Sequence, residues 1–331
     1  MDTINISRVI ENNYDIDIRY IEQIKNAYKI DSKDRGYCVK VIGYKFPHFY
    51  FILSAMKHLQ KKGFKTVPSI IKTKNNMDFI KLGDKYAYLT EWIPSRISNY
   101  DNPIELAKVA EKIGELHTCS TGFILDRRMT PRYGWNKWIS TFSTRCDEML
   151  DFAHRISQKA KKSEFDRLYL EHLDEEIERG IASINGLKES NYFYLMNKEI
   201  MKCGFCHHDL AHHNILVDRN GELNIIDFDY CILDSHIHDL SSLMIRAMKD
   251  GKWSKEKADL ILNNYSISNE VKDEELNIMK YFIKFPQVFW QVGIQYYWEQ
   301  QLWGEDFFVS KLKKYLDDRE EREEFLEEYF R

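Results

Sequence analysis

The sequence lacks the two patterns that mark secreted and membrane-embedded chains. Its first residues, MDTINISRVIENNYDID, carry early acids and contain neither the basic region nor the apolar stretch of a signal peptide. No apolar run is long enough to span a bilayer, and the longest, near residues 46–56 and 285–294, are short or interrupted. We therefore expect a chain made in the cytoplasm without a signal peptide, with reduced thiols and no membrane partner.

The sequence also lacks a large excess of charge of either sign. Its formal net charge is −4 and its pI is about 6.3, so the overall charge predicts no binding to nucleic acid. The 331 residues are 44% hydrophobic and 30% charged, a balance typical of a globular protein. We find no internal repeat, and the length suffices for two domains or one enzyme with two lobes.

The first third of the chain has mainly strand-like patterns. Residues 14–30 and 37–42 alternate in the manner of strands, and Asp31–Gly36 between them is typical of a turn. Pro47 can open a helix that continues to residue 62 and ends at Gly63. Residues 77–82 and 86–93 flank Gly83-Asp84, which predicts a hairpin, and Pro94-Ser95 is interpreted as a linker.

The remaining two thirds are predominantly helical by pattern. Short strand-like segments, with an Asn220-Gly221 hairpin turn between the last two, interrupt the helices at residues 203–206, 215–217 and 223–226. The helical period of 3.6 covers residues 104–117, 135–152 and 163–187, and it resumes from Asp239 to a charged last helix over 311–331.

The stretch CGFCHHDLAHHN, residues 203–214, is compatible with three kinds of chemistry. Cys203, Cys206 and His207 have the CxxCH spacing of covalent haem attachment, but that attachment requires export, for which we find no signal. The four histidines lie too close together for the usual spacing of a zinc site, so the cysteines are better interpreted as small buried side chains. His207, Asp209 and Asn214 have the HxDxxxxN spacing of a kinase catalytic loop.

The rest of the chain favours the kinase interpretation. Transfer of a phosphoryl group from ATP requires a lysine on a strand, an aspartate near the acceptor hydroxyl, and an asparagine and second aspartate for magnesium. Lys40 in YCVKVI, Asp209 and Asn214 in HHDLAHHN, and Asp227 in IIDFDY supply these groups in the same order. Because the Asn-Gly hairpin joins the last two segments, we expect Asn214 and Asp227 to lie close together.

Longer motifs extend this likeness to a family. HHDLAHHNILVD resembles the HGDxHxxNxL loop, and IIDFDY the IDW/F segment, of the aminoglycoside phosphotransferase and choline kinase group of protein-kinase-like folds. IGELHT and LTEWIPSR are similar to a helix and to the lobe-connecting hinge of that group. Within the group, NAYKIDS, GYCVKVI and FPQVFWQVGIQYYWEQQLW resemble CotS-type spore coat proteins, and the likeness covers essentially the whole chain.

The resemblance implies an α+β, bilobal protein-kinase-like fold. Residues 1–92 would form an N-lobe with a nucleotide-binding antiparallel sheet and one helix, and residues 93–331 a mainly helical C-lobe with the catalytic loop and acceptor site. It implies ATP and Mg²⁺ as cofactors and transfer of the γ-phosphate to a hydroxyl of a small molecule or sugar. It also implies association with the spore coat, where other coat proteins would be partners.

The resemblance further implies the role of each site residue. For Asp229 two interpretations stay open, a second metal ligand or supporting residue and a solvated loop acid. The other implied roles are Asp209 as the catalytic aspartate, Lys40 as a contact of the ATP phosphates, Asn214 and Asp227 as Mg²⁺ ligands, the backbone of Thr90–Trp92 as the adenine contact, His207 as support for the loop, and Asp239 as a brace for it.

The sequence departs from the family pattern in three places. No Asp or Glu occurs from Gly43 through Met77, so Lys40 lacks the helix glutamate with which active kinases pair this lysine. No glycine-rich loop precedes Lys40, and His208 replaces the glycine of HGD. Two functions therefore stay open, an active phosphotransferase and a structural or docking coat protein on a kinase-like scaffold.

Overall fold

The computed structural model describes residues 3–330, and the chain packs as two compact units. The first, here called the sheet unit, comprises the chain up to Asn99 together with residues 112–132 and 203–233. The second, the helical unit, comprises residues 100–111, 133–202 and 234 onward. These units are defined by packing rather than by chain order, and the lobe boundary expected after residue 92 stays a prediction.

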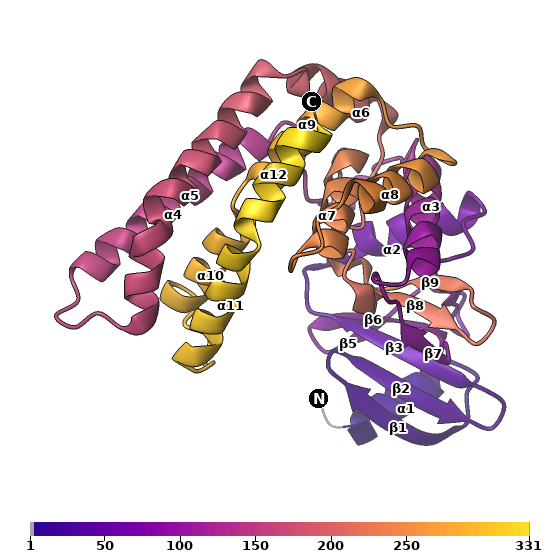
Figure 1. Cartoon of the computed structure of the whole chain (residues 1–331). Coiled ribbons are helices and arrows are strands. Elements are labelled where there is room, and N and C mark those ends of the chain that lie inside the picture. The colour runs from indigo at the N-terminus through magenta and orange to yellow at the C-terminus, as the bar shows by residue number, and fades with distance from the viewer. Residues whose placement is uncertain (1–2, 331) are drawn as a thin grey trace. The chain divides into compact units, whose positions relative to one another are not determined.

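The sheet unit is built on an antiparallel sheet with the strand order β1-β2-β3-β6-β4, in which β5 also pairs with β6 (Figure 1). Ile24 pairs with Ala27, so the predicted strand over residues 14–30 is in fact two strands joined by a two-residue turn. The hairpin predicted at Gly83-Asp84 is confirmed. The strands are β1 (Ile18–Ile24), β2 (Ala27–Ser32), β3 (Gly36–Ile42), β4 (Ile70–Ile71), β5 (Ile80–Leu82) and β6 (Lys85–Glu91).

One face of this sheet is covered by helix α1 (Thr3–Asn13), which the sequence did not predict. Ile6 and Ile10 of α1 and Tyr14 after it are buried against strand residues such as Val39 and Leu89. The spacing of these three apolar residues, four apart, places them on one side of a helix. The N-terminal part thus has one helix more than expected, because a polar segment with only one apolar stripe gives a weak pattern.

The opposite face carries Lys40 and packs against helix α2 (Phe46–Lys61). Side chains alternate along a strand, so Lys40 and its cross-strand partners Ala27 and Tyr88 share this face. Pro47 stands in the first turn of α2, as predicted, where its missing N–H leaves no helical hydrogen bond unmade. Phe49 of α2 stacks on Tyr86 of β6 with ring centroids 5.1 Å apart.

A second, three-stranded sheet has the order β7-β8-β9, formed by β7 (Ser95–Ile97), β8 (Ile215–Asp218) and β9 (Leu223–Ile225). The predicted β8–β9 hairpin is confirmed, and its turn ends at Gly221, which has φ +79°. The interpretation of Pro94-Ser95 as a linker was wrong for Ser95, because Ser95 pairs with Asp218 in the sheet. Residues 203–206 form no strand, since only Cys206 makes an isolated bridge, with Ile232.

The helical unit confirms the predicted helical character of the later chain. Helix α3 (Pro103–Ser120) begins in this unit and ends in the sheet unit. The others are α4 (Trp138–Ser157), α5 (Glu164–Glu189), α6 (Tyr192–Lys202), α7 (His236–Met248), α8 (Lys255–Ser266), α9 (Asp273–Lys284), α10 (Gln287–Tyr297), α11 (Glu305–Asp317) and α12 (Arg319–Tyr329). Within residues 3–330, no helix combines the length and the apolar character that a membrane span requires.

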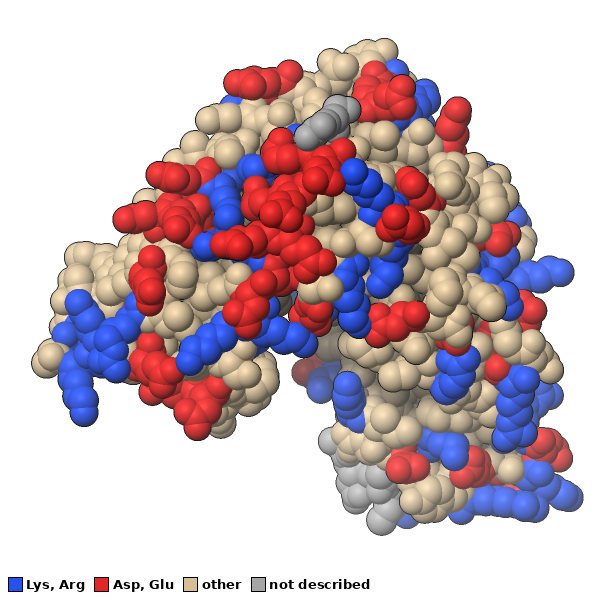
Figure 2. Space-filling model, viewed as in Figure 1, with Lys and Arg blue, Asp and Glu red and all other residues tan. Residues whose placement is uncertain are grey.

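The single last helix predicted over residues 311–331 was wrong, since α11 and α12 meet at Asp318. The Asp318 carboxylate is buried and accepts hydrogen bonds from the Trp253 indole and the Gly251 N–H. Figure 2 shows Asp and Glu gathered over α12, interspersed with Lys and Arg. Ion pairs such as Lys284 with Glu323 connect α12 to α9, so this charged helix is docked rather than merely solvated.

Candidate functional site

The main candidate site is a pocket of about 890 Å³ in the sheet unit. This volume lies in the range of small-molecule and cofactor pockets. Its walls come from the Lys40 face of the sheet, the segment after β6 and the β8–β9 hairpin. Among the residues predicted from sequence, those that line it are Lys40, Thr90, Trp92, Asn214 and Asp227.

Lys40 is held by two carboxylates that come from one short segment. Its Nζ lies 2.9 Å from Asp227 Oδ1 and 3.4 Å from Asp229 Oδ2. The Lys40 side chain is only 10% exposed, so its charge requires this compensation. In kinases the corresponding lysine pairs with a glutamate of the neighbouring helix. Here Asp227 and Asp229 pair with Lys40 instead, and α2 contributes the apolar, buried Met56 to the pocket wall.

His207 anchors the loop of residues 207–214, here called the HHD loop. Its ring is fully buried, with Nε2 2.9 Å from the Ile226 carbonyl oxygen and Nδ1 3.3 Å from the Asp209 backbone nitrogen. Because a carbonyl only accepts and a backbone N–H only donates, Nε2 carries the proton and Nδ1 accepts. These contacts tie the HHD loop to the residue before Asp227, which suits a supporting role.

Asp209 and Asn214 are joined inside the HHD loop. The Asn214 side-chain amide donates to the Asp209 carboxylate at 2.8 Å and to the Asp209 carbonyl oxygen at 2.9 Å. Because the amide nitrogen of Asn214 is engaged in these two bonds, its side-chain oxygen is the atom that can bind a cation. The Ile226 N–H donates to the Asn214 carbonyl at 2.9 Å, so the hairpin brings Asn214 beside the segment of Asp227, as expected.

Asp227 and His208 both have a left-handed backbone. Asp227 has φ 67° and ψ 64°, and His208 has φ 70°. A side chain costs about 1–2 kcal/mol in this region, whereas glycine adopts it freely. This explains physically why glycine is usual where the chain has His208, and it marks Asp227 as a strained position of the kind that clusters at functional sites.

Burial dominates the electrostatics around Lys40. It raises the pKa of Asp229 to about 6, against the lowering by Lys40, and the negative charge of Asp227 adds to the rise. Burial also raises the pKa of the Cys38 thiol to about 11. The site therefore holds more acidic groups than Lys40 can neutralise, a surplus that favours a bound cation.

The oxygen donors present fit a magnesium ion. Oδ1 of Asp227 and Oδ1 of Asp229 are buried and have no hydrogen-bond donor among residues 3–330. Lys40 is within ion-pair distance of the first of these atoms, but the two are not aligned as a hydrogen bond. Buried carboxylate oxygens and an amide oxygen are the ligands that hard divalent cations prefer, so Asp227 with Asn214, and Asp229 beside them, could hold Mg²⁺.

The segment after β6 lines the pocket, and its backbone N–H groups differ in whether they are hydrogen-bonded. The Trp92 N–H donates to the Gly36 carbonyl at 3.0 Å and is therefore occupied by β3. Thr90 lies within β6, opposite Cys38. Within the described chain, the Ile93 N–H has no hydrogen-bond partner, and Ile93 lines the pocket. The sequence alone does not show which N–H of this segment is free, because that depends on strand register. The expected contact of the Thr90–Trp92 backbone with adenine stays a prediction.

Asp239 lies in the other unit from the HHD loop. It is fully buried within α7 of the helical unit. Its predicted role as a brace for the HHD loop stays a prediction. The chemical roles proposed for the residues around the pocket likewise stay predictions.

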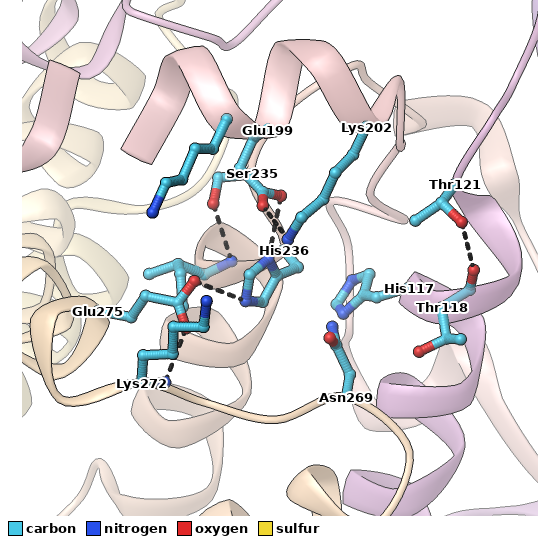
Figure 3. A network of polar contacts seen from close by, with 12 residues as sticks. His117, Thr118, Thr121, Glu199, Lys202, Ser235, His236, Asn269, Lys272 and Glu275 are labelled. Atoms are coloured by element: carbon cyan, nitrogen blue, oxygen red, sulfur yellow. Dashed lines mark hydrogen bonds and ion pairs between the residues drawn. The ribbon is translucent and has the colours of Figure 1, made fainter. Parts of the chain in front are cut away.

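A second cluster of titratable side chains lies in the helical unit (Figure 3). Glu199, His236 and Glu275, from α6, α7 and α9, are all buried and place three possible metal ligand atoms within 4.8 Å of one another. His236 Nδ1 lies 3.0 Å from Glu199 and Nε2 lies 3.4 Å from Glu275. The carboxylates thus engage opposite ring nitrogens, whereas a metal ion would bind one nitrogen with both carboxylates beside it.

Charge balance also favours ion pairing over a metal in this cluster. Burial lowers the pKa of His236, but the contacts of its ring with the carboxylates of Glu199 and Glu275 outweigh burial and raise the pKa to about 9. The Lys202 ammonium adds a second positive charge, 2.6 Å from Glu199. Two carboxylates thus face two cations, and the cluster is a structural connection between α6, α7 and α9.

Comparison with known proteins places these features in a family. Residues 7–329 match the family model described as "Spore coat putative kinase YutH". Spore coat protein S of Bacillus subtilis (strain 168) is 23% identical over 279 residues, which make up 84% of this chain and 79% of that protein. The resemblance to spore coat proteins expected from the sequence is confirmed.

Solved structures confirm the fold. An aminoglycoside phosphotransferase from Alicyclobacillus acidocaldarius has a TM-score of 0.84 and 21% identity, covering 97% of this chain and 94% of that one. Spectinomycin phosphotransferase, in complex with ADP and spectinomycin, has a TM-score of 0.65 and 15% identity over 96% of this chain and 94% of that one. The predicted α+β, protein-kinase-like fold is therefore correct.

Proposed function

Because this chain belongs to the YutH family of spore coat kinase-like proteins, we propose that it is a phosphotransferase that uses ATP and Mg²⁺. The γ-phosphate would move to a hydroxyl of a small molecule or sugar, and ADP would leave. The observation that carries the proposal is the meeting of Lys40, Asp227 and the Asn214–Asp209 pair around one nucleotide-sized pocket. The binding of ADP by a phosphotransferase of the same fold is consistent with it.

Each residue of the site has a part in the proposed reaction. Asp209 accepts the proton of the attacking hydroxyl as the oxygen forms its bond to phosphorus. Lys40 contacts the phosphates and leaves Asp227 free to bind the cation, which Asn214 and Asp229 help to hold. A bound Mg²⁺ supplies positive charge against the transferring phosphoryl group. The backbone of Glu91–Ile93, which lines the pocket, would hydrogen-bond adenine.

A test begins with the release of ADP. Purified protein is incubated with Mg·ATP and a panel of alcohols, including aminoglycosides, amino alcohols and monosaccharides. Release of ADP that depends on one acceptor class, and that Asp209→Asn removes, is the expected result. ATP binding without turnover on any acceptor would favour the second function below.

The second candidate is a catalytically silent, kinase-like docking protein of the spore coat. It is favoured by the lack of a helix carboxylate, since the α2 residue in the pocket wall is Met56. It predicts that Asp227→Ala protein is retained in the coat and that the coat assembles normally. Loss of assembly on removal of this one metal ligand would instead connect the coat function to the site.

A further inference from the structure

The turn between β1 and β2 forms part of the pocket wall where kinases have a glycine-rich loop. Its two residues, Lys25 and Asn26, both line the pocket. The Asn26 carbonyl accepts a hydrogen bond from the Val41 N–H at 3.1 Å, directly after Lys40 on β3. Ala27, which follows the turn, is the cross-strand partner of Lys40. The turn is therefore fixed beside the strand that carries the phosphate-contacting lysine.

Lys25 has a conformation that its residue type disfavours. Its φ is 54°, in the left-handed region that glycine adopts freely and that side chains rarely occupy. The chain thus keeps a lysine at a position where glycine would be less strained. Strain at a ligand-facing residue is a reason to look for a function of its side chain.

The charges around the pocket show what this side chain could do. Lys40 is already shared between Asp227 and Asp229, and Asp209, hydrogen-bonded to the pocket residue Asn214, adds a further carboxylate. A cation bound to these acids offsets their surplus, but it leaves little positive charge for a triphosphate. Lys25 is exposed, and among residues 3–330 its ammonium has no carboxylate within ion-pair distance.

We propose that Lys25 is a phosphate-binding residue of the nucleotide site. Its ammonium contacts the terminal phosphates of a bound nucleoside triphosphate, the contact that backbone N–H groups make in a glycine-rich loop. The inference rests on the proposed function, because it requires that the pocket bind ATP. Lys25 selects triphosphates over monophosphates, while the segment at Ile93 contacts the base.

Calorimetric titration of Mg·ATP and of AMP into wild type and Lys25→Met protein tests this role. We expect Lys25→Met to weaken ATP binding by about tenfold or more, since a charged hydrogen bond is lost, and to leave AMP binding unchanged. Lys33→Met is the matched control, because Lys33 is an exposed lysine in the turn at the other end of β2. It should change neither affinity.

Lys25→Gly separates conformation from charge. Glycine relieves the left-handed strain, so this variant should melt no lower than wild type and still bind ATP as weakly as Lys25→Met. An ATP affinity unchanged in either variant, or an equal loss for ATP and AMP, would overturn the proposal for Lys25 alone. Failure of the wild type to bind ATP would overturn the proposed function and this inference together.

Discussion

The ammonium of Lys40 lies 2.9 Å from Asp227 Oδ1, and Asp229 from the same segment completes its carboxylate partners. In kinases the corresponding lysine pairs with a glutamate of the neighbouring helix. Here the lysine and the proposed metal ligands form one ion pair. We therefore expect a bound magnesium ion to share these two carboxylates with Lys40.

Removal of Lys40 should destabilise the protein and increase its response to Mg²⁺. Lys40→Met leaves two carboxylates facing each other, which should lower the free energy of unfolding by about 1–3 kcal/mol, less than for a fully buried pair because Asp227 is 33% exposed. Mg²⁺ without nucleotide should then raise the melting temperature of the variant more than that of wild type. Thermal melting checks both effects, with Lys81→Met on β5 as a control. Equal Mg²⁺ responses would argue against a shared site.

Replacement of Asp209 should affect turnover and spare nucleotide binding. Asp209→Asn keeps the size of the side chain but cannot accept the proton of the acceptor, so the rate should fall by about 10²–10⁴-fold. ADP release on the best acceptor measures the rate, and calorimetry with Mg·ATP measures binding. Asp84→Asn, in the β5–β6 turn, is the matched control. A rate within a few-fold of wild type would remove Asp209 from the chemistry.

Glycine at position 208 should stabilise the fold. The left-handed backbone of His208, with φ 70°, is relieved in His208→Gly, which should add up to about 1 kcal/mol of stability, or about 2–4 °C in melting temperature. If the imidazole also contacts the acceptor, KM for the acceptor rises while ATP affinity stays constant. A lower melting temperature would show that the side-chain contacts of His208 outweigh its backbone strain.

The cluster around His236 predicts a pH dependence of stability. The pKa of about 9 in the folded protein lies above the ordinary histidine value of 6.5, so the stabilisation is complete below pH 6.5 and is lost as pH rises through 9. The groups that face His236 are Glu199 and Lys202 of α6, Glu275 of α9 and Tyr265 of α8. Wild type should therefore melt well above His236→Gln at pH 6, and the difference should shrink by pH 9.5. A difference that does not change with pH would mean that His236 is not charged.

The same cluster offers a direct check against a metal site. Incubation with a strong chelator should leave the melting temperature unchanged at pH 7, because the charges of Glu199 and Glu275 are balanced by His236 and Lys202. A drop that added zinc or manganese restores would instead identify a metal centre between α6, α7 and α9.

The sequence predicted what is encoded in short segments. The β3 strand with Lys40, the helix opened by Pro47 and the hairpin that joins Asn214 to Asp227 each follow from local residue patterns. Motif spacing likewise identified the HHD loop, since a kinase-type loop keeps its polar groups within a few residues.

Contacts between distant segments were not predictable in this way. The pairing of Lys40 with Asp229, the strand β7 at Ser95 and the break between α11 and α12 all depend on partners far away in the sequence. Backbone torsion angles were equally unpredictable, because the sequence HHD does not show that the backbone of His208 is in the left-handed region. The free N–H of Ile93 follows only from the register of β3 and β6.

The most direct test of the nucleotide site is calorimetric titration of ATP into wild type and Asp227→Ala protein, each with and without Mg²⁺. We expect that Mg²⁺ strengthens ATP binding in wild type, and that binding in Asp227→Ala is weaker and does not depend on Mg²⁺. Saturation with ATP at a hundredfold its Kd should also stabilise wild type by about 2.7 kcal/mol. No binding by wild type at millimolar Mg·ATP would contradict a nucleotide site in this pocket and would favour a kinase-like scaffold of the spore coat.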